Sequence, residues 1–336
     1  MNKLLTIVVP VYKVELYINK CLDSCLIYKT NEQGEKVLDE EIMSQLEVII
    51  VNDGTPDQSA EMSREYVRRY PQTFRQIDKE NGGHGSAWNV GLKEATGKYL
   101  RFLDSDDWLT NLERFMKDLE SCDTDLVFTH LDKFMAKEGK FVRFSISGVY
   151  NRIMNVDEFD YSANGDYTMA DFQYCTYKTA LFKPLWPLFD EHCMYDDMIL
   201  HIAPQLLGET YIIYDYVLYN YLIGRDGQTM SPEIMERNCH FLFQEYKKII
   251  SFYQKYRESH VSSNWAENVI ISHITGYQLK NLLKLPYGKF HTGASEIKRD
   301  TRNFTINSKS KQWRRFNKYP LWMFFLLEKV RSWKNG

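Results

Sequence analysis

Two carboxylates separated by one residue are the clearest chemical signal in this sequence. Asp104 and Asp106 flank Ser105 in a segment that directly follows an apolar run. Alternate side chains of an extended segment point the same way, so the two carboxylates can share one site. Such a pair needs a cation, and Mg²⁺ or Mn²⁺ bound there would accept diphosphate oxygens as ligands and neutralise a leaving group. Taken alone, the triplet also suits a solvated turn that caps a helix starting near Asn111.

The elements that would position these carboxylates are β-strands. Ligands of open α/β sheets bind beyond the carboxyl ends of the strands. Beyond the expected strands lie three segments: Pro10-Val11-Tyr12, Asn52-Asp53-Gly54 and Asp104-Ser105-Asp106-Asp107. We expect these strand ends to converge on one crevice, which favours a cation site over a capped turn.

The chain before residue 130 alternates β-branched runs with amphipathic stretches, a pattern typical of a parallel sheet with crossover helices. Strands are expected over Leu4 to Val9, Leu46 to Val51, Tyr99 to Leu103 and Leu126 to Thr129. Helices are expected over Val14 to Leu26, Ser59 to Tyr70 and Ser86 to Ala95. The pattern predicts an α/β nucleotide-binding half of the protein.

The intervening and later segments give weaker patterns. Thr30 to Ser44 is polar and charged, and we expect a surface loop there. Phe141 to Ile146 and Gln173 to Tyr177 could form a second, smaller sheet. Candidate helices follow over Ile234 to Tyr256 and Trp265 to Leu285. We therefore expect an α/β catalytic domain over residues 1–225 and a helical region over residues 226–336.

The formal net charge of −3 over 336 residues hides a basic C-terminal segment. Between Lys298 and Gly336 the chain has eleven Lys and Arg residues against two acidic ones. The rest of the chain is acidic, so we do not expect one uniformly charged partner for the whole molecule. Nucleic acid is not expected as a partner, because nothing else in the sequence suggests a groove or a stacking platform for bases.

The basic segment also interleaves aromatic residues with its cations over residues 309–334. Such a segment can lie among lipid headgroups, with its rings inserted and its cations over anionic lipid. The alternative is a helix that docks on the protein's own core or on a second subunit.

The six cysteines and the apolar runs bear on location. The cysteines are scattered without a CxxC pair, so we expect buried thiols in a reducing compartment. The N-terminal apolar run stops at Pro10 without a small-residue cleavage site, and the run from Leu321 to Leu327 is too short to span a bilayer. We expect a cytoplasmic location, including a peripheral position at the inner face of the plasma membrane.

Five motifs in order carry a family resemblance. They are Thr6-Ile7-Val8-Val9-Pro10-Val11-Tyr12, Val48-Ile49-Ile50-Val51-Asn52-Asp53-Gly54, Asn81-Gly82-Gly83, Asn89-Val90-Gly91-Leu92 and Leu103-Asp104-Ser105-Asp106-Asp107. In these motifs the chain strongly resembles family 2 glycosyltransferases of the GT-A fold. The resemblance implies an α/β, Rossmann-like nucleotide-sugar-binding domain with a mixed central sheet, followed by a helical C-terminal region. It also implies that the catalytic domain divides into a nucleotide-binding half over residues 1–110 and an acceptor half over residues 111–225.

The resemblance also implies a donor site and a metal site. The donor site would comprise Pro10, Val11, Tyr12, Glu15, Asp53, Gly83, Asp104, Ser105 and Arg225. Pro10 and Tyr12 match the turn that faces the uracil, and Asp53 matches the carboxylate that accepts a hydrogen bond from the base. Asp104 matches the ribose side of the DxD motif, and Asp106 matches the direct ligand of Mn²⁺ or Mg²⁺.

A second acidic segment matches the catalytic base of the family. An inverting transfer needs a base that deprotonates the acceptor hydroxyl. By position Asp197 matches this base, with Asp196 in place of the usual Glu. An Asp pair at a helix start is also an ordinary cap. Arg225 matches a mobile loop that closes the site and could clamp the diphosphate, with a solvated surface arginine as the alternative.

The chain departs from the family pattern at Trp88, where relatives often have Arg before Asn-x-Gly. His84 and Ser86, in and just after the glycine-bearing turn, could replace part of that contact.

We therefore predict an inverting, metal-dependent hexosyltransferase that uses a UDP-sugar to assemble a bacterial surface polysaccharide or a glycan on a lipid or protein. One alternative is a catalytically silent scaffold that only binds the nucleotide-sugar. Another is a sugar nucleotidyltransferase, which would carry a Gly-rich, basic loop after the first strand, and Pro10 to Lys13 is not such a loop.

Overall fold

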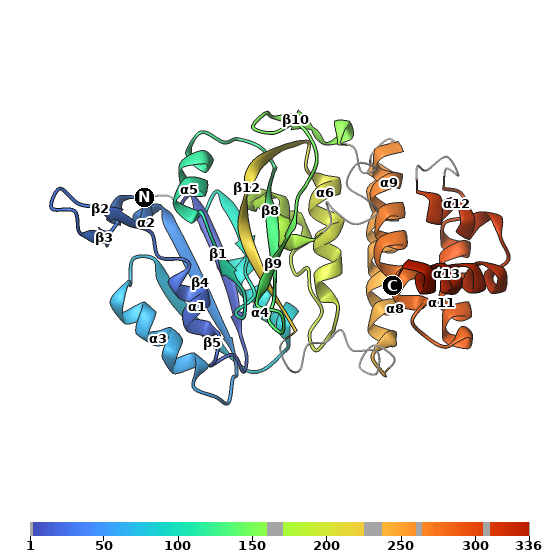
Figure 1. The fold of residues 1–336 in the computed structure, drawn as a ribbon, viewed down its shortest axis with the longest axis horizontal. Coiled ribbons are helices and arrows are strands. Elements are labelled where there is room, and N and C mark those ends of the chain that lie inside the picture. The colour runs from blue at the N-terminus through green and yellow to red at the C-terminus, as the bar shows by residue number, and fades with distance from the viewer. Residues whose placement is uncertain (1–2, 160–170, 225–236, 260–263, 305–309, 336) are drawn as a thin grey trace. The chain divides into compact units, whose positions relative to one another are not determined.

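The computed structural model describes residues 3–159, 171–224, 237–259, 264–304 and 310–335. The chain forms two compact units. Unit 1 comprises Met1–Glu158, Asp171–Asp197 and Leu207–Gly227, and unit 2 comprises Phe159–Ala170, Met198–Leu206 and Gln228–Gly336. Unit 1 is built on one large sheet, and the described part of unit 2 is helical (Figure 1).

One side of the sheet consists of four parallel strands. They are β1 (Leu5–Val11), β4 (Leu46–Asp53), β5 (Phe74–Lys79) and β6 (Tyr99–Phe102), in the spatial order β5-β4-β1-β6. β1 and β4 are buried along their whole length, as expected of apolar strands covered on both faces. The sequence pattern does not predict β5, because its residues are mostly polar and it lies at the edge of the sheet.

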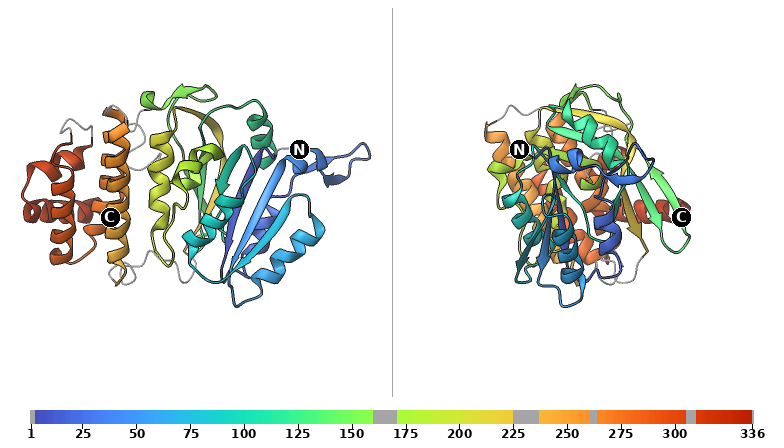
Figure 2. Two further views of the ribbon diagram at one scale, coloured as in Figure 1. Left: turned by 180° about the vertical axis from the view of Figure 1, so that it is seen from behind. Right: turned by 90° about the vertical axis from the view of Figure 1, so that its left-hand side faces the viewer.

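Beyond β6 the sheet becomes mixed. β11 (Cys175–Lys178) lies between β6 and β8 (Leu126–Met135) and runs antiparallel to both, while β12 (Thr210–Ile223) is parallel to β8. Three short strands complete it: β7 (Trp108–Leu109), β9 (Lys140–Phe144) and β10 (Met154–Asn155). In the end-on view of Figure 2, the green hairpin of β8 and β9 extends away from the body of the sheet.

The prediction of a separate, smaller sheet from Phe141 to Ile146 and Gln173 to Tyr177 is therefore wrong. β9 and β11 both join the main sheet, and the fully buried Tyr177 pairs with strands on both sides. Alternation of side chains identifies a strand but does not identify the strand with which it pairs.

Short helices connect the strands. They are α1 (Ile18–Asp23), α2 (Glu40–Gln45), α3 (Ser59–Arg69), α4 (His84–Glu94), α5 (Leu112–Glu120), α6 (Ala203–Leu207) and the 3-10 helices η1 (Val156–Glu158), η3 (Phe172–Tyr174), η4 (Thr179–Leu185) and η5 (Asp196–His201). The loop expected from Thr30 to Ser44 is instead a hairpin of β2 (Tyr28–Thr30) and β3 (Lys36–Leu38) that leads into α2. This hairpin projects from unit 1, so its polar side chains remain solvated (Figure 1).

The helical character expected of the C-terminal region is confirmed. Its described helices are α8 (Cys239–Ser259), α9 (Asn264–His273), the π-helix η6 (Ile274–Gln278), α10 (Leu279–Leu282), α11 (Tyr287–Asp300), α12 (Lys311–Lys318) and α13 (Leu321–Asn335). Among the tail's aromatic residues, Trp313, Phe316 and Phe324 are buried in this unit, whereas Trp322 is 53% exposed. Part of the tail therefore docks on the protein's own helices. Among the described residues, no helix has the length and apolar character needed to cross a membrane.

Candidate active site

The carboxyl ends of β1, β4 and β6 lie side by side at one edge of the sheet. Val11 pairs with Asn52, and Val8 pairs with Phe102, so the residues that follow each strand emerge at the same edge. The expected convergence of the three strand ends is therefore observed. It brings together segments that lie far apart in the sequence.

Asp53, at the end of β4, organises the glycine turn that precedes α4. The residue is 2% exposed, and its two side-chain oxygens accept hydrogen bonds from the N–H groups of Gly82 and Gly83, both at 2.9 Å. Lys79 Nζ also lies 2.7 Å from the carboxylate. Gly83 has φ of +92°, a conformation that glycine adopts without strain. A nucleobase that bonded to Asp53 would therefore have to share these contacts.

The turn after β1 is open to solvent on one side. Tyr12 is 43% exposed, and Glu15 accepts a hydrogen bond from the Gln58 N–H at 3.3 Å. A cavity of about 340 Å³ is lined by Lys13, Glu15, Leu16, Tyr17, Pro56 and Asp57. This volume lies at the lower end of the range that small-molecule sites occupy.

The segment after β6 gathers three carboxylates. Oxygens of Asp104, Asp106 and Asp107 lie within 4.8 Å of one another, while Ser105 between them is buried. Burial, followed by the charges of Asp104 and Asp106, raises the pKa of Asp107 well above its usual range. Closely spaced carboxylate oxygens are the ligands that Mg²⁺ and Mn²⁺ prefer, so these residues fit a divalent cation.

Asp107 anchors this segment to β12, a role that the sequence pattern does not predict. Its oxygens accept a hydrogen bond from the Tyr219 hydroxyl at 2.6 Å and another from the Leu222 N–H at 2.7 Å. The Tyr219 oxygen in turn accepts from the Asp104 N–H at 3.2 Å. The position of Asp107 directly after Asp104-Ser105-Asp106 marks it as a candidate residue of the site. Its partners cannot be predicted from this pattern, because they lie more than 100 residues away.

His84 joins the carboxylate cluster to the second acidic pair. Its Nε2 lies 3.0 Å from an oxygen of Asp104, and its Nδ1 lies 3.4 Å from an oxygen of Asp196. Partial desolvation lowers the pKa of His84, whose side chain is 39% exposed, but hydrogen bonds to the two carboxylates and their charges outweigh it, so the pKa is raised well above its usual value. The structure thus brings the two acidic segments to opposite sides of one imidazole.

Asp196 and Asp197 begin η5. Asp196 is buried, and its Oδ2 has no hydrogen-bond partner within the part of the chain that the structure describes. Burial, followed by the charge of Asp196, raises the pKa of Asp197 to about 7. In the preceding segment His192 and Tyr195 have positive φ angles of 52° and 65°, a strained conformation for residues with side chains.

The first turns of α4 and the glycine turn before it hold this segment in place. The Ser86 hydroxyl donates to Glu191 at 2.9 Å, and the Gly82 carbonyl accepts from the His192 N–H at 2.6 Å. A Cβ at Gly85 would collide with Asp196 Oδ2, which explains why a glycine is needed there. Trp88, at the position where relatives often have Arg, is fully buried and packs against His84 with ring centroids 4.0 Å apart. Trp88 therefore supports the ring of His84 from the interior of unit 1.

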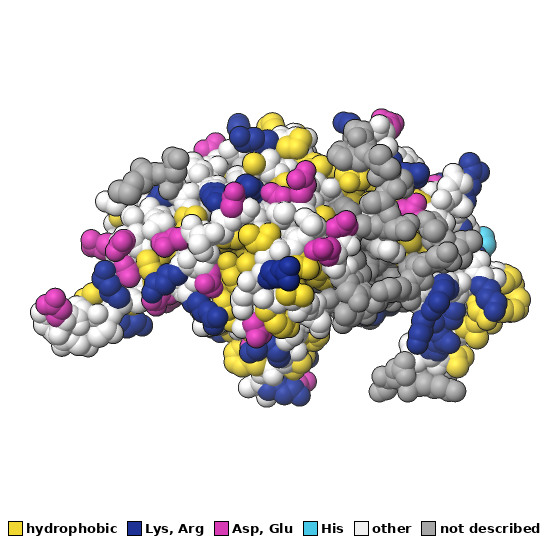
Figure 3. All heavy atoms as spheres, turned by 90° about the horizontal axis from the view of Figure 1, so that it is seen from above, with side chains coloured by type: hydrophobic (Ala, Val, Ile, Leu, Met, Phe, Trp, Pro, Cys, Tyr) yellow, Lys and Arg dark blue, Asp and Glu magenta, His cyan; other side chains and the backbone are white. Residues whose placement is uncertain are grey.

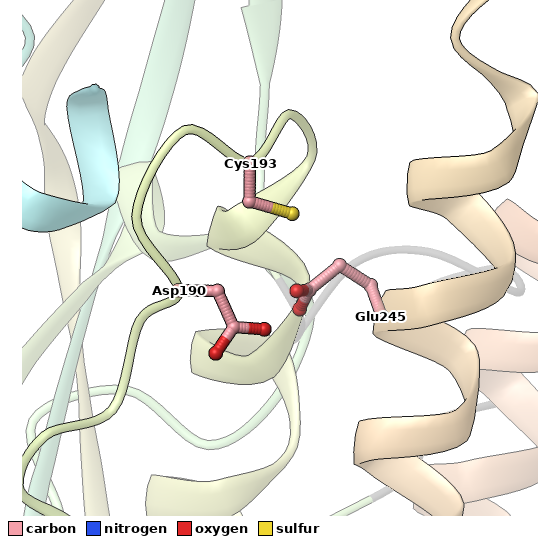
Figure 4. Close-up of side chains that lie close together, drawn as sticks. All are labelled: Asp190, Cys193 and Glu245. Atoms are coloured by element: carbon pink, nitrogen blue, oxygen red, sulfur yellow. The ribbon is translucent and has the colours of Figure 1, made fainter. Parts of the chain in front are cut away.

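Arg225 and one further set of side chains are not assigned to the site. Arg225 lies outside the described residues. Figure 4 labels Asp190 and Cys193, on the segment before η5, together with Glu245 of α8. Asp190 and Cys193 belong to unit 1 and Glu245 to unit 2, so we assign no shared ligand to the three.

The sequence of residues 6–186 matches the family described as Glycosyl transferase family 2, which is more than half of the chain. The chain belongs to this family. This family 2 glycosyltransferase is 29% identical over 262 residues to the uncharacterized glycosyltransferase EpsJ of Bacillus subtilis (strain 168), covering 76% of the chain and 71% of EpsJ. It is 35% identical over 102 residues to the minor teichoic acid biosynthesis protein GgaB of the same organism, covering 30% of the chain but 10% of GgaB.

A solved structure shows the same fold. The glycosyltransferase aligns with S. aureus TarS 1-349 in complex with UDP over 89% of both chains, with a TM-score of 0.58 and 16% identity. The expected fold, a GT-A α/β domain with a mixed sheet followed by helices, is therefore confirmed.

Proposed function

We propose that this glycosyltransferase moves a hexose or related sugar from a UDP-sugar to an acceptor hydroxyl with inversion of the anomeric carbon. The observation that carries the proposal is the position of His84 between Asp104 and Asp196. A metal-binding carboxylate cluster and a carboxylate pair that could deprotonate an acceptor are thereby separated by a single imidazole ring. An inverting transfer needs a cation beside the leaving diphosphate and a base beside the acceptor hydroxyl, on opposite sides of the anomeric carbon.

The donor would bind across the ends of β1, β4 and β6. Pro10, Val11 and Tyr12 would face the base with Glu15 beside them, and Asp53, Gly83 and Ser105 would line the nucleotide. The complex of TarS with UDP supports this choice of nucleotide. The role of Arg225 as a diphosphate clamp rests on the sequence alone.

Asp104 and Asp106 would hold Mn²⁺ or Mg²⁺. Such an ion supplies positive charge for the departing diphosphate. We expect Asp106→Asn to abolish manganese-stimulated activity and to weaken Mn²⁺ binding measured by calorimetry. Asp157→Asn, which changes an exposed aspartate in η1, is the matched control. Equal Mn²⁺ affinity in both variants would overturn the metal assignment.

Asp197 would act as the base. It would take the proton of the acceptor hydroxyl while the acceptor oxygen bonds to the anomeric carbon and the bond from that carbon to the diphosphate oxygen breaks. The raised pKa, about 7, suits this role, because a base works best with a pKa near the working pH. Attack from the side opposite the leaving nucleotide inverts the anomeric configuration.

A donor panel tests the proposal. The purified protein would be incubated with UDP-, GDP- and dTDP-sugars plus Mn²⁺, and nucleotide release would be measured. We expect release from a UDP-sugar, and we expect Asp197→Asn to reduce transfer by about 10²- to 10⁴-fold while UDP still binds. Nucleotide binding without release from any donor would instead identify a catalytically silent binding protein.

The cellular setting we propose is assembly of a bacterial surface polysaccharide or of a glycan on a lipid or protein, at the inner face of the plasma membrane. The similarity to GgaB supports this setting. In α13, Trp322, Leu326 and Val330 form an exposed apolar stripe at helical spacing, and Lys329 and Arg331 lie beside it. Figure 3 shows hydrophobic side chains lying between Lys and Arg side chains on the face that it draws. Such a surface suits an anionic bilayer.

Vesicle sedimentation tests the membrane contact. Wild-type protein should pellet with phosphatidylglycerol-containing vesicles, and the double variant Trp322→Ser, Leu326→Ser should bind about tenfold more weakly. Ile153→Ser removes an equally exposed apolar side chain from unit 1 and serves as the control. Unchanged pelleting of the double variant would show that α13 is not the anchor.

A further inference from the structure

Three aromatic rings form a cluster immediately beyond the carboxylate segment. Trp108 of β7 directly follows Asp107, Phe134 lies on β8, and Phe141 lies on β9. The ring centroids are 4.9 Å apart for Phe134 and Phe141, 5.8 Å for Trp108 and Phe134, and 6.2 Å for Trp108 and Phe141. Phe141 is 54% exposed, and the other two rings are partly exposed. The cluster therefore presents ring surface to solvent.

Strand pairing ties this cluster to the proposed metal site. Leu222 of β12 lies opposite Phe134, and the Leu222 N–H donates to Asp107 at 2.7 Å. Trp108 is paired with Asn220 of the same strand. The Lys20 Nζ of α1 lies 3.0 Å from the ring centroid of Trp108. Burial lowers the pKa of Lys20, and the charge of the nearby Asp107 opposes this shift. One face of Trp108 is therefore capped, which leaves Phe141 as the most accessible ring.

A charged pair borders the rings on the same face of the hairpin. Arg143 lies two residues from Phe141, and Asp132 lies two residues from Phe134, so all four side chains point to one face. The guanidinium contacts both carboxylate oxygens of Asp132, with the Nη2 to Oδ2 distance at 3.2 Å. The rings thus have a polar rim with both donors and acceptors.

We propose that Trp108, Phe134 and Phe141 form an acceptor subsite that takes the C–H face of a pyranose ring, with Asp132 and Arg143 bonding to its hydroxyls. This inference rests on the proposed transferase function. An acceptor must lie beside the donor that the carboxylates hold, and the cluster adjoins them through Asp107 and Leu222. A sugar ring presents an apolar face and a polar edge, and this surface offers an aromatic face with a polar rim.

The hairpin itself provides a matched control. Phe144 is 37% exposed and lies on the opposite face from Phe141, where the Lys133 Nζ is 4.3 Å from its ring centroid. Phe144→Ala removes an exposed aromatic ring from the same strand without touching the proposed subsite. Phe141→Tyr keeps the ring, and Phe141→Ala removes it.

The probes are the methyl α- and β-glycosides of glucose, galactose, N-acetylglucosamine and mannose. Saturation-transfer NMR should detect binding of at least one of them to the full chain. Phe141→Ala should weaken that binding about tenfold, whereas Phe141→Tyr and Phe144→Ala should keep it. Retained UDP binding by the same preparation shows that the alanine variant is folded.

Three results would overturn the subsite. The first is that no glycoside gives a signal with the wild type, and the second is that Phe141→Ala and the wild type bind glycosides equally well. The third is that Phe141→Ala loses pelleting with phosphatidylglycerol vesicles but keeps glycoside binding, which would identify a membrane contact. Failure of the transferase proposal is separate: it would show as no nucleotide release from any donor, even where glycoside binding depends on Phe141.

Discussion

Asn89 and Phe189 are joined by hydrogen bonds in both directions. The Asn89 Nδ2 donates to the Phe189 carbonyl at 2.7 Å, and its Oδ1 accepts from the Phe189 N–H at 3.1 Å. The same Oδ1 accepts from the Leu188 N–H at 2.9 Å. One carboxamide on α4 therefore holds the backbone of the segment that leads to Asp196 and Asp197.

Replacing Asn89 with Ala should disturb this segment. The variant loses three hydrogen bonds, so we expect the free energy of unfolding to fall by about 2–3 kcal/mol. We expect kcat to fall by about tenfold or more with a smaller change in the donor KM, because the base would be misplaced while the donor site remains. Steady-state kinetics and thermal denaturation measure both effects.

Asn317→Ala is the control for this variant. Asn317 also donates to a backbone carbonyl, that of Trp313 at 3.0 Å, but it lies in the helical unit. It should keep the wild-type kcat. A wild-type kcat in Asn89→Ala would refute the positioning role.

The rate should depend on pH through Asp197. Its pKa is raised to about 7 by burial and then by the charge of Asp196, and a base acts only when ionised. We therefore expect kcat to fall about tenfold per pH unit below pH 7 or so. Asp196→Asn removes the neighbouring charge, so it should move this acid limb to lower pH. A limb that stays in place would rule out Asp197 as the titrating base.

The same shift predicts a stability effect. The folded state binds the Asp197 proton more tightly than the unfolded state does, so this group favours folding at low pH, and the advantage is lost as pH rises from about 4 through 7. Asp197→Asn stays neutral throughout. Without metal, its Tm should exceed that of the wild type at about pH 8 and approach it at about pH 4. If the Tm of Asp197→Asn differed from that of the wild type by the same amount at both pH values, the raised pKa of Asp197 would be contradicted.

Tyr219 and Tyr216 form a matched pair on β12. Each hydroxyl donates to a carboxylate at 2.6 Å, Tyr219 to the buried Asp107 and Tyr216 to the partly exposed Asp118. Tyr219→Phe leaves a buried oxygen short of a donor, so it should cost about 2–3 kcal/mol of unfolding free energy. Tyr216→Phe should cost about 1 kcal/mol or less, because water can replace the lost donor. Chemical denaturation measures both, and equal costs would show that burial of Asp107 has no consequence.

An added methyl group should have opposite effects at Gly85 and at Gly288. A Cβ at Gly85 would meet Asp196 Oδ2 and would lie 2.6 Å from the Phe189 Cβ, so Gly85→Ala should displace the base segment and lower kcat by at least about tenfold. At Gly288 in α11 nothing lies within 4 Å, and Gly288→Ala should stabilise the protein by about 0.5–1 kcal/mol. Kinetics and thermal denaturation of the two variants distinguish these outcomes. Unchanged kcat in Gly85→Ala would show that the segment tolerates displacement.

The residue types on the donor side of the site can be predicted without the structure. Uninterrupted apolar runs predict β1 and β4, since only buried strands need them. The turn and acidic residues that follow such runs must lie at one edge of the sheet, because parallel strands end together. The family resemblance in the same motifs added the fold and the reaction class.

Which of these residues come into contact depends on the packing of the folded chain. His84 and Asp196 are separated by 112 positions and Asn89 and Phe189 by 100, and no local periodicity reports such a pairing. The same holds for β11, whose short sequence predicts a strand but not its place between β6 and β8. Periodicity records which side chains are buried, whereas contact between distant segments depends on how the whole sheet and its connections pack.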